Sequence, residues 1–140
     1  MEMKKIKNRY TREIMCGGKS LQEIIALHKE YLNYSEIGKR ADLTDADLRC
    51  ADLTNADLGW ANLTNADLTN ADMTNADLTR ADLRWAVLAS ADLTGADMTG
   101  ADMTGADLTD ADMTNAYLTR AVLTNADPKA KKRNSRRKNP

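Results

Sequence analysis

The chain has 140 residues, a length that suits one domain with short appendages. Its net charge of −1 averages three unlike segments: nine Lys or Arg against five Glu in 1–40, four Arg against sixteen Asp in 41–127, and seven Lys or Arg without an acid in 128–140. No apolar run approaches the ~20 residues that cross a bilayer, and none follows the basic start, so the sequence predicts neither a membrane span nor a secretory signal.

Residues 1–40 are predicted to form an N-terminal arm and a short capping helix. Residues 1–18 are polar and are expected to be loose at the start. Ser20-Leu-Gln-Glu23 then matches a capping box. Apolar residues follow it at helical spacing, with the only histidine among them: Leu21, Ile24, Ile25, His28, Tyr31 and Leu32. This pattern predicts an amphipathic helix over about 21–33, and Gly38 then breaks the chain.

Residues 41–127 repeat with a period of five. Alanine stands at every fifth position from Ala41 to Ala126, and Leu or Met follows two residues later from Leu43 to Leu123. In an α-helix, successive leucines would lie about 140° apart and would define no face. In a flat strand they would point alternately up and down. A backbone that turns by about 90° every five residues directs all of them into a square coil, and successive coils stack at roughly 4.7–4.9 Å.

The inward leucines and methionines are the predicted core of these coils. Asn or Gly at the fifth position of many repeats, as at Asn55 and Gly95, tolerates the conformation that a corner needs. The core positions are Leu43, Leu48, Leu53, Leu58, Leu63, Leu68, Met73, Leu78, Leu83, Leu88, Leu93, Met98, Met103, Leu108, Met113, Leu118 and Leu123.

The repeat Ala-(Asp/Asn)-(Leu/Met)-X-X resembles the pentapeptide-repeat family over residues 41–127. The resemblance implies an all-β solenoid, a right-handed quadrilateral β-helix of about four coils. An open solenoid end exposes apolar core, so we expect the helix over 21–33 to cap the first coil, although it could instead dock a partner. Residues 128–140 are predicted to form a disordered basic tail. The N-terminal segment followed by ADLTDADL is similar to small phage and bacterial members of the family.

The sequence predicts a protein that is not an enzyme. No nucleophile–histidine–acid set, Gly-rich phosphate loop or Cys/His cluster accompanies His28, which we expect to be a packed or surface residue. The Asp array lacks the Gly-Gly-x-Gly-x-Asp pattern of calcium-binding β-rolls. Cys16 and Cys50 form no disulfide framework or metal pattern and fit free thiols in a reducing compartment. We therefore expect a cytoplasmic protein without a cofactor or a metal.

With four repeats per coil, residues twenty apart stack on one side. Asp52, Asp72, Asp92 and Asp112 then form an unbroken column, and Asp57, Asp77 and Asp97 form a second one that ends in Tyr117. Two interpretations stay open: the acids provide solubility, or they imitate the phosphates of a nucleic acid. Some pentapeptide-repeat proteins act as DNA mimics that bind type II topoisomerases such as DNA gyrase. The resemblance therefore implies a type II topoisomerase as partner, although this chain lacks the core phenylalanines common in those relatives. A defence nuclease is a further candidate partner if the gene is viral.

Self-association as a structural scaffold is the alternative function. Family members often dimerise through the C-terminal coil, and here no apolar segment after Leu123 could cover that coil, so we expect a homodimer through this end. Trp60, Trp85 and Tyr117 point outward and are candidate interface anchors together with Leu123.

Stacked threonines also suggest ice binding, but the flanking aspartates hydrate the same sides. Direct contact with nucleic acid is expected only through the tail, a basic arm or a solvated end, with Lys129, Lys131, Lys132, Arg133, Arg136, Arg137 and Lys138.

Overall fold

The computed structural model describes residues 15–16, 19–34 and 38–127, so the predicted basic tail and most of the N-terminal arm lie outside the described residues. Strands β1 (Met15–Cys16) and β2 (Lys19–Ser20) pair antiparallel, and helix α1 (Leu21–Asn33) follows directly. The sequence predicts the range of α1 but not the pairing of β1 with β2. Within the described segments, no helix combines the length and the hydrophobicity of a bilayer-crossing segment.

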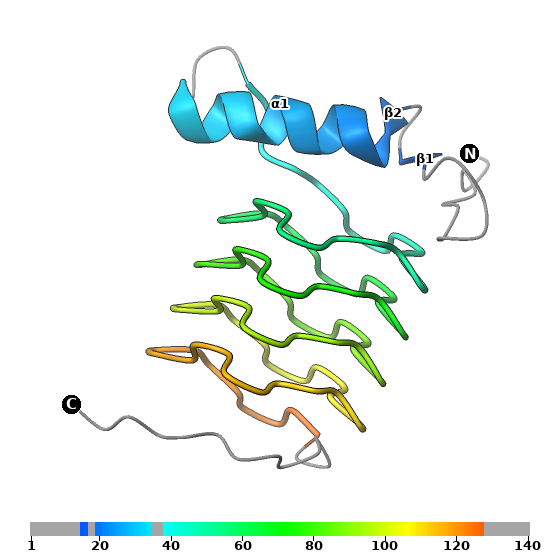
Figure 1. The fold of residues 1–140 in the computed structure, drawn as a ribbon, viewed down its shortest axis with the longest axis vertical. Coiled ribbons are helices and arrows are strands. Elements are labelled where there is room, and N and C mark those ends of the chain that lie inside the picture. Colours follow the sequence, from blue (N-terminus) through cyan, green and yellow to red (C-terminus); the bar gives the residue numbers. More distant parts are fainter. Residues whose placement is uncertain (1–14, 17–18, 35–37, 128–140) are drawn as a thin grey trace.

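Residues 41–127 wind into a parallel β-helix with twenty residues per coil. Fourteen isolated parallel bridges in this segment join the second residue of a repeat to the residue twenty positions later, from Asp42–Asn62 to Asp107–Asp127. Backbone N–H groups donate to carbonyls one coil away, as from Leu53 to Asp72 at 2.7 Å. The coils stack in a column, and α1 lies across the end of the column that the chain enters first (Figure 1).

Each corner of a coil is a four-residue turn closed by one backbone hydrogen bond. The N–H of the alanine that opens a repeat donates to the carbonyl three residues earlier, as from Ala56 to Leu53 at 3.0 Å. The fifth residue of every repeat from Asp45 to Asn125 has a φ between 55° and 70°. A type II turn requires this sign at its third residue, and Gly and Asn adopt it most readily. The corners therefore explain why those two residue types recur at the fifth position.

Alanine, leucine and methionine side chains fill the inside of the coils. All of the inward residues from Ala41 to Ala111 are buried, and Leu21 and Ile24 of α1 join the same core. The C-terminal members of the predicted core differ, because Met113 and Leu118 are only partly buried and Leu123 is 42% exposed. Within the described residues no further coil stacks on these three side chains, so they form the rim of the core rather than its interior.

Candidate interaction surfaces

The carboxylates of the two predicted acidic columns are tied to the turns that follow them. Asp72 Oδ1 accepts the Thr74 N–H at 3.1 Å and the Thr74 hydroxyl at 2.7 Å. Every Asp in both columns accepts the N–H two residues later in the same way. This Asx turn gives Asp a structural reason to stand at the second position of a repeat. β-Bridges link Asp52, Asp72, Asp92 and Asp112 in one column and Asp57, Asp77, Asp97 and Tyr117 in the next.

The Asx hydrogen bonds use the side-chain oxygen but not its charge. Asn62 holds the same place in its repeat and accepts the Thr64 N–H at 3.1 Å and the Thr64 hydroxyl at 2.7 Å. Carboxylates stacked about 4.8 Å apart repel each other by roughly 0.9 kcal/mol per pair even in water. Asparagine would therefore build the same turn without this repulsion, so the negative charge of the columns is not a requirement of the local fold.

Two arginines of the β-helix pair with an aspartate two residues earlier. Arg84 donates to both carboxylate oxygens of Asp82, at 2.8 and 2.6 Å. Arg49 binds Asp47 in the same way, at 2.7 and 2.6 Å, and its Nε lies 3.8 Å from Asp67 one coil further on. The hydrogen bond from the guanidinium lowers the pKa of Asp47 and of Asp82. The contacts of Arg49 show that one guanidinium can reach two carboxylates stacked on successive coils.

The two tryptophans are positioned by residues one coil away. The Arg80 guanidinium lies 4.8 Å from the centre of the Trp60 ring, within cation–π distance. Arg40 Nε donates to the Trp60 carbonyl at 2.5 Å. A Cβ built on Gly105 would fall 2.3–2.8 Å from three carbon atoms of the Trp85 ring, so this ring lies across the glycine. Trp60 is nevertheless 46% exposed and Trp85 58% exposed, so both rings stay accessible.

Both tryptophans occupy corner positions that the backbone favours for other residues. Trp60 has a φ of 64° and Trp85 a φ of 60°. This left-handed region costs a residue with a Cβ about 1–2 kcal/mol, whereas Gly and Asn visit it routinely. Nine of the seventeen corner positions with positive φ hold Asn or Gly. Because the backbone at these corners disfavours tryptophan, the formation of the turn does not explain why Trp60 and Trp85 stand there.

The tryptophans and most of the arginines share one side of the β-helix. The tryptophan side carries five Lys or Arg against four Asp, and it consists of residues 39–45, 59–65, 79–85, 99–105 and 119–125. The acidic side carries one Arg against five Asp, and it consists of residues 49–55, 69–75, 89–95 and 109–115. The two sides are half of a twenty-residue coil apart. They therefore face in opposite directions.

The last described coil adds apolar groups to the surface. Tyr117 is 63% exposed, and Val122 and Leu123 are each 42% exposed. Val122 continues the ladder of the tryptophan side from Asp102, and Tyr117 ends the column that begins at Asp57. The predicted interface residues Trp60, Trp85, Tyr117 and Leu123 are thus all exposed, but Leu123 belongs to the open rim while the tryptophans lie along a side.

His28 joins α1 to the first coil. Its side chain is fully buried, and this burial lowers its pKa below the ordinary value of 6.5. Nδ1 accepts the Ala41 N–H at 2.9 Å, so the proton of the neutral ring is on Nε2, which donates to the Gly59 carbonyl at 2.6 Å. The ring also stacks on Tyr31 with 5.7 Å between the ring centres. The structure therefore gives His28 a packing role, through partners that the sequence did not indicate.

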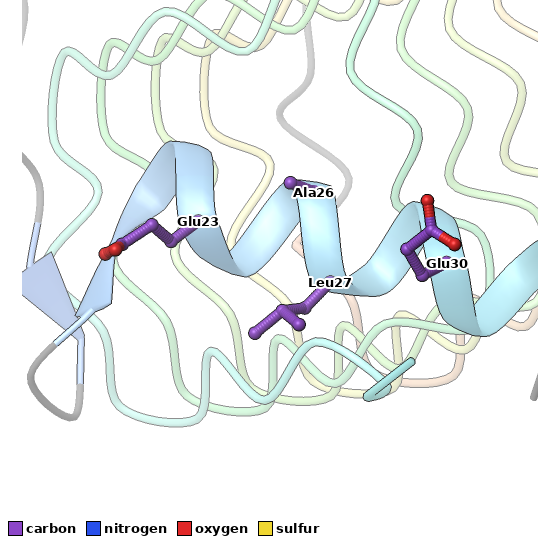
Figure 2. Close-up of a pocket in the computed structure, with 4 residues that line it drawn as sticks. All are labelled: Glu23, Ala26, Leu27 and Glu30. Atoms are coloured by element: carbon purple, nitrogen blue, oxygen red, sulfur yellow. The ribbon is translucent and has the colours of Figure 1, made fainter. Parts of the chain in front are cut away.

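The outward surface of α1 contains an open hollow. Figure 2 shows the four described residues that line it, Glu23, Ala26, Leu27 and Glu30, which supply two carboxylates and two apolar side chains. Among the described residues, no group of three or more His, Cys, Asp or Glu side chains is arranged to hold a metal ion. Cys50 is a free, partly buried thiol.

These features define a four-sided parallel β-solenoid that displays aspartates, arginines and two tryptophans on its outer sides. The sequence profile of pentapeptide repeats matches the chain in eight copies, over residues 41–80, 56–88, 66–105 and 101–127. The chain belongs to the pentapeptide-repeat family, which confirms the resemblance seen in the sequence. Its fold is accordingly the right-handed β-helix of that family.

Solved structures of the same family match the chain. A pentapeptide repeat protein from the cyanobacterium Cyanothece 51142 is 34% identical with a TM-score of 0.63, and the match covers 66% of this chain and 65% of that one, slightly under two thirds of the relative. Another, from Nostoc Pcc 7120, is 34% identical over 69% of this chain and 71% of that one, with a TM-score of 0.35. QnrB1, a plasmid-mediated fluoroquinolone resistance protein, is 19% identical over 61% of this chain and 64% of that one, with a TM-score of 0.40. TM-scores of 0.35 and 0.40 are too low to support an argument about function. No curated protein matches the chain.

Proposed function

We propose that the protein is a non-catalytic interaction module whose acidic columns imitate the phosphates of duplex DNA. The proposed partner is a nucleic-acid-handling protein, either a type II topoisomerase such as DNA gyrase or a defence nuclease. One observation carries this proposal. Asp52, Asp72, Asp92 and Asp112 form an unbroken, ladder-linked column, and the equivalent turn at Asn62 shows that the fold does not need their charge.

The charge density of the columns is of the same order as that of DNA. One column supplies a carboxylate about every 4.8 Å along the axis, and the neighbouring column of Asp57, Asp77 and Asp97 brings the spacing to about 2.4 Å. Duplex DNA carries one charge per about 1.7 Å of axis. The Asx turns hold each carboxylate in place before a partner arrives, which reduces the entropy lost on binding.

The test is a fourfold isosteric variant, Asp52→Asn, Asp72→Asn, Asp92→Asn and Asp112→Asn. We expect the wild type to capture a DNA-binding protein from a nuclease-treated lysate and to bind purified DNA gyrase, and we expect duplex DNA to compete with it. The variant should lose this binding, because the charges that replace the phosphates are gone while the turns persist. Pull-down and binding titrations at several salt concentrations measure both effects.

A matched control carries the same charge change on the two interrupted columns, as Asp42→Asn, Asp67→Asn, Asp102→Asn and Asp107→Asn. We expect this control to keep most of the binding. Equal capture of the same partner by wild type, variant and control would show that the acids serve solubility alone.

Self-association through the C-terminal coil is the second candidate function. The exposed Val122 and Leu123 and the partly buried Met113 and Leu118 favour it, because they leave an apolar rim at this end, whereas α1 packs on the first coil. Sedimentation velocity should then reveal a dimer, and Leu123→Lys should shift it to the monomer. A monomer at tens of micromolar would exclude this mode of association.

A further inference from the structure

We propose that the tryptophan side of one copy of this chain docks on the acidic side of a second copy, so that the β-helices associate side by side. This inference goes beyond the proposed function, since it concerns the side of the molecule that the acid columns leave unused. Three properties of the two sides carry it: charge, relief and spacing.

The two sides are complementary in charge. The tryptophan side carries five Lys or Arg against four Asp, and one of those aspartates, Asp82, is already paired with Arg84. The acidic side carries five Asp against one Arg, and that one, Arg49, is paired with Asp47. The exposed cations of the tryptophan side therefore face outward on one surface, and a carboxylate column faces outward on the opposite surface. Such an arrangement favours contact between unlike sides and opposes contact between like sides.

The two sides are also complementary in relief. The side chains of Trp60 and Trp85 project from the tryptophan side at about half exposure, and Val122 adds a further apolar group at the same side. On the acidic side the outward residues are Asp, Thr, Asn, Ser, Gly, Ala and Cys, all short, with Arg49 as the single long side chain at the first coil. Projecting aromatic and arginine side chains on a surface of short ones are typical anchors of protein interfaces.

The spacing of the charges matches because both sides belong to one ladder. Arg80 and Arg120 stand at one corner two coils apart, with Gly100 between them and Trp60 one coil before Arg80. The backbone positions of Arg80 and Arg120 are therefore about 9.6 Å apart, which equals two steps of the carboxylate column on a neighbouring copy. Arg40 precedes the first repeat and donates to the Trp60 carbonyl. Arg49 shows the required contact within one chain, since it reaches Asp47 and Asp67 on successive coils. Arg120 can bridge two acids in the same manner, while the Arg80 guanidinium reaches the interface together with the Trp60 ring on which it lies.

Docking of opposite sides is a heterologous contact, which does not close on itself and therefore continues from copy to copy. It also covers the column of Asp52, Asp72, Asp92 and Asp112, so self-association and binding of a DNA-handling partner compete for the same acids. A change on the tryptophan side affects self-association but not the binding of a DNA-handling partner. An experiment on this side therefore tests the present inference independently of the proposed function.

Two variants that remain compatible with the fold test the inference. The first replaces the tryptophan side with the residue most frequent at these corners, as Trp60→Asn, Arg80→Asn, Trp85→Asn and Arg120→Asn. The second is the acidic-side variant Asp52→Asn, Asp72→Asn, Asp92→Asn and Asp112→Asn. In sedimentation velocity at about 50 mM salt, we expect wild-type assemblies to grow with concentration beyond a dimer and to dissociate at about 500 mM salt. Each variant should raise the concentration needed for association by about tenfold or more.

Mixing the two variants gives the sharpest result. The first retains an intact acidic side and the second an intact tryptophan side, so an equimolar mixture should form a one-to-one complex that cannot grow further. Tryptophan fluorescence provides a second readout, because the chain has two tryptophans and both lie on the tryptophan side. Emission of the wild type should shift to shorter wavelength on association and return at high salt. As a control, Asp57→Asn, Asp77→Asn and Asp97→Asn remove three charges from a neighbouring column and should leave association almost unchanged.

Three results would overturn the inference. One is a wild type that stays monomeric at low salt up to hundreds of micromolar. Another is a closed dimer that neither variant affects, which would assign association to the C-terminal rim. The third is a monomer whose tryptophan fluorescence is quenched by a single-stranded oligothymidylate in the wild type and not in the tryptophan-side variant. That outcome would assign this side to nucleic acid.

Discussion

At the scale of single residues, the two hydrogen bonds of the His28 ring depend on its protonation state. Nδ1 must be unprotonated to accept the Ala41 N–H, while Nε2 donates to the Gly59 carbonyl. A proton on Nδ1 would bring two N–H donors face to face inside the cap. Burial lowers the pKa of His28; the Gly59 hydrogen bond and the charge of Asp57 act in the opposite direction, and Arg40 adds to the lowering. The neutral ring is therefore the form that holds α1 on the first coil.

This linkage predicts a loss of stability in mild acid. Since the folded-state pKa of His28 lies below the unfolded value of 6.5, the unfolded chain binds the proton more readily. The contribution of His28 is thus complete above that value and declines as the pH falls through the window below it. Urea unfolding between about pH 7.5 and 5 should show the advantage of wild type over His28→Asn shrinking as the pH falls. An advantage that is constant or grows towards acid would contradict this account.

The Asx turns predict a difference between two substitutions of one aspartate. Asp72→Ala removes both hydrogen bonds to Thr74 and should reduce the free energy of unfolding by about 1–2 kcal/mol. Asp72→Asn keeps the accepting oxygen and relieves the repulsion from Asp52 and Asp92, so it should leave the free energy of unfolding unchanged or raise it by up to about 2 kcal/mol. Denaturant titration of the two variants compares them directly. A similar loss in both would mean that the charge itself stabilises the turn.

At the scale of elements, each coil depends on its neighbours for the burial of its core, because the hydrogen bonds within a coil only close its corners. Leu78 is fully buried between coils, whereas Leu118 lies in the partly buried rim. Leu78→Ala should therefore lower the free energy of unfolding by about 2–5 kcal/mol through lost burial and a residual cavity. Leu118→Ala should lower it by less than half of that amount, because the site already faces solvent. Thermal or urea unfolding of the pair measures this gradient, and equal losses would show that the last coil is covered in solution.

At the scale of the whole molecule, the two ends of the β-helix differ. The first coil is joined to α1 through His28, Leu21 and Ile24. At the other end, Met98 and Met103 still donate to carbonyls one coil further on, at Tyr117 and Val122. Within the described residues, Met113, Leu118 and Leu123 have no such coil below them. The first coil is therefore covered by α1, whereas the last described coil presents unpaired strand edges and an apolar rim within the described residues.

Amide hydrogen exchange should report this asymmetry. We expect the N–H groups of the inward leucines and methionines from Leu43 to Met103 to be strongly protected, since each donates to the next coil. The amides of Met113, Leu118 and Leu123 should exchange faster by orders of magnitude in the monomer. Dimerisation through the C-terminal rim would protect them, whereas side-by-side association would not. Uniform protection in a monomeric sample would contradict the expected gradient.

Residue periodicity accounts for what could be predicted. Alanine and leucine at fixed intervals of five can be buried together only if the chain turns at every repeat, so the coil, its pitch and the inward residues follow from the pattern. The same arithmetic places Asp52 above Asp72, because four turns of about 90° close one coil after twenty residues. Capping-box spacing predicts α1 for a similar local reason. The sequence also indicated that nothing after Leu123 covers the last coil, and the exposure of Leu123 agrees with this. How far the exposure reaches back, to Met113 and Leu118, was decided by the structure.

The sequence by itself determined the solenoid, its family and the columns of acid, since these depend on a repeat that every coil obeys. Only the tertiary structure decided what the exceptions do. His28 meets Gly59, thirty-one residues away, because α1 folds over the first coil. Arg80 meets Trp60, and Trp85 lies across Gly105, because a coil brings residues twenty apart into contact. The repeat by itself specifies how the coils stack. The contacts of a residue that departs from the repeat depend on which residues lie beside it one coil away.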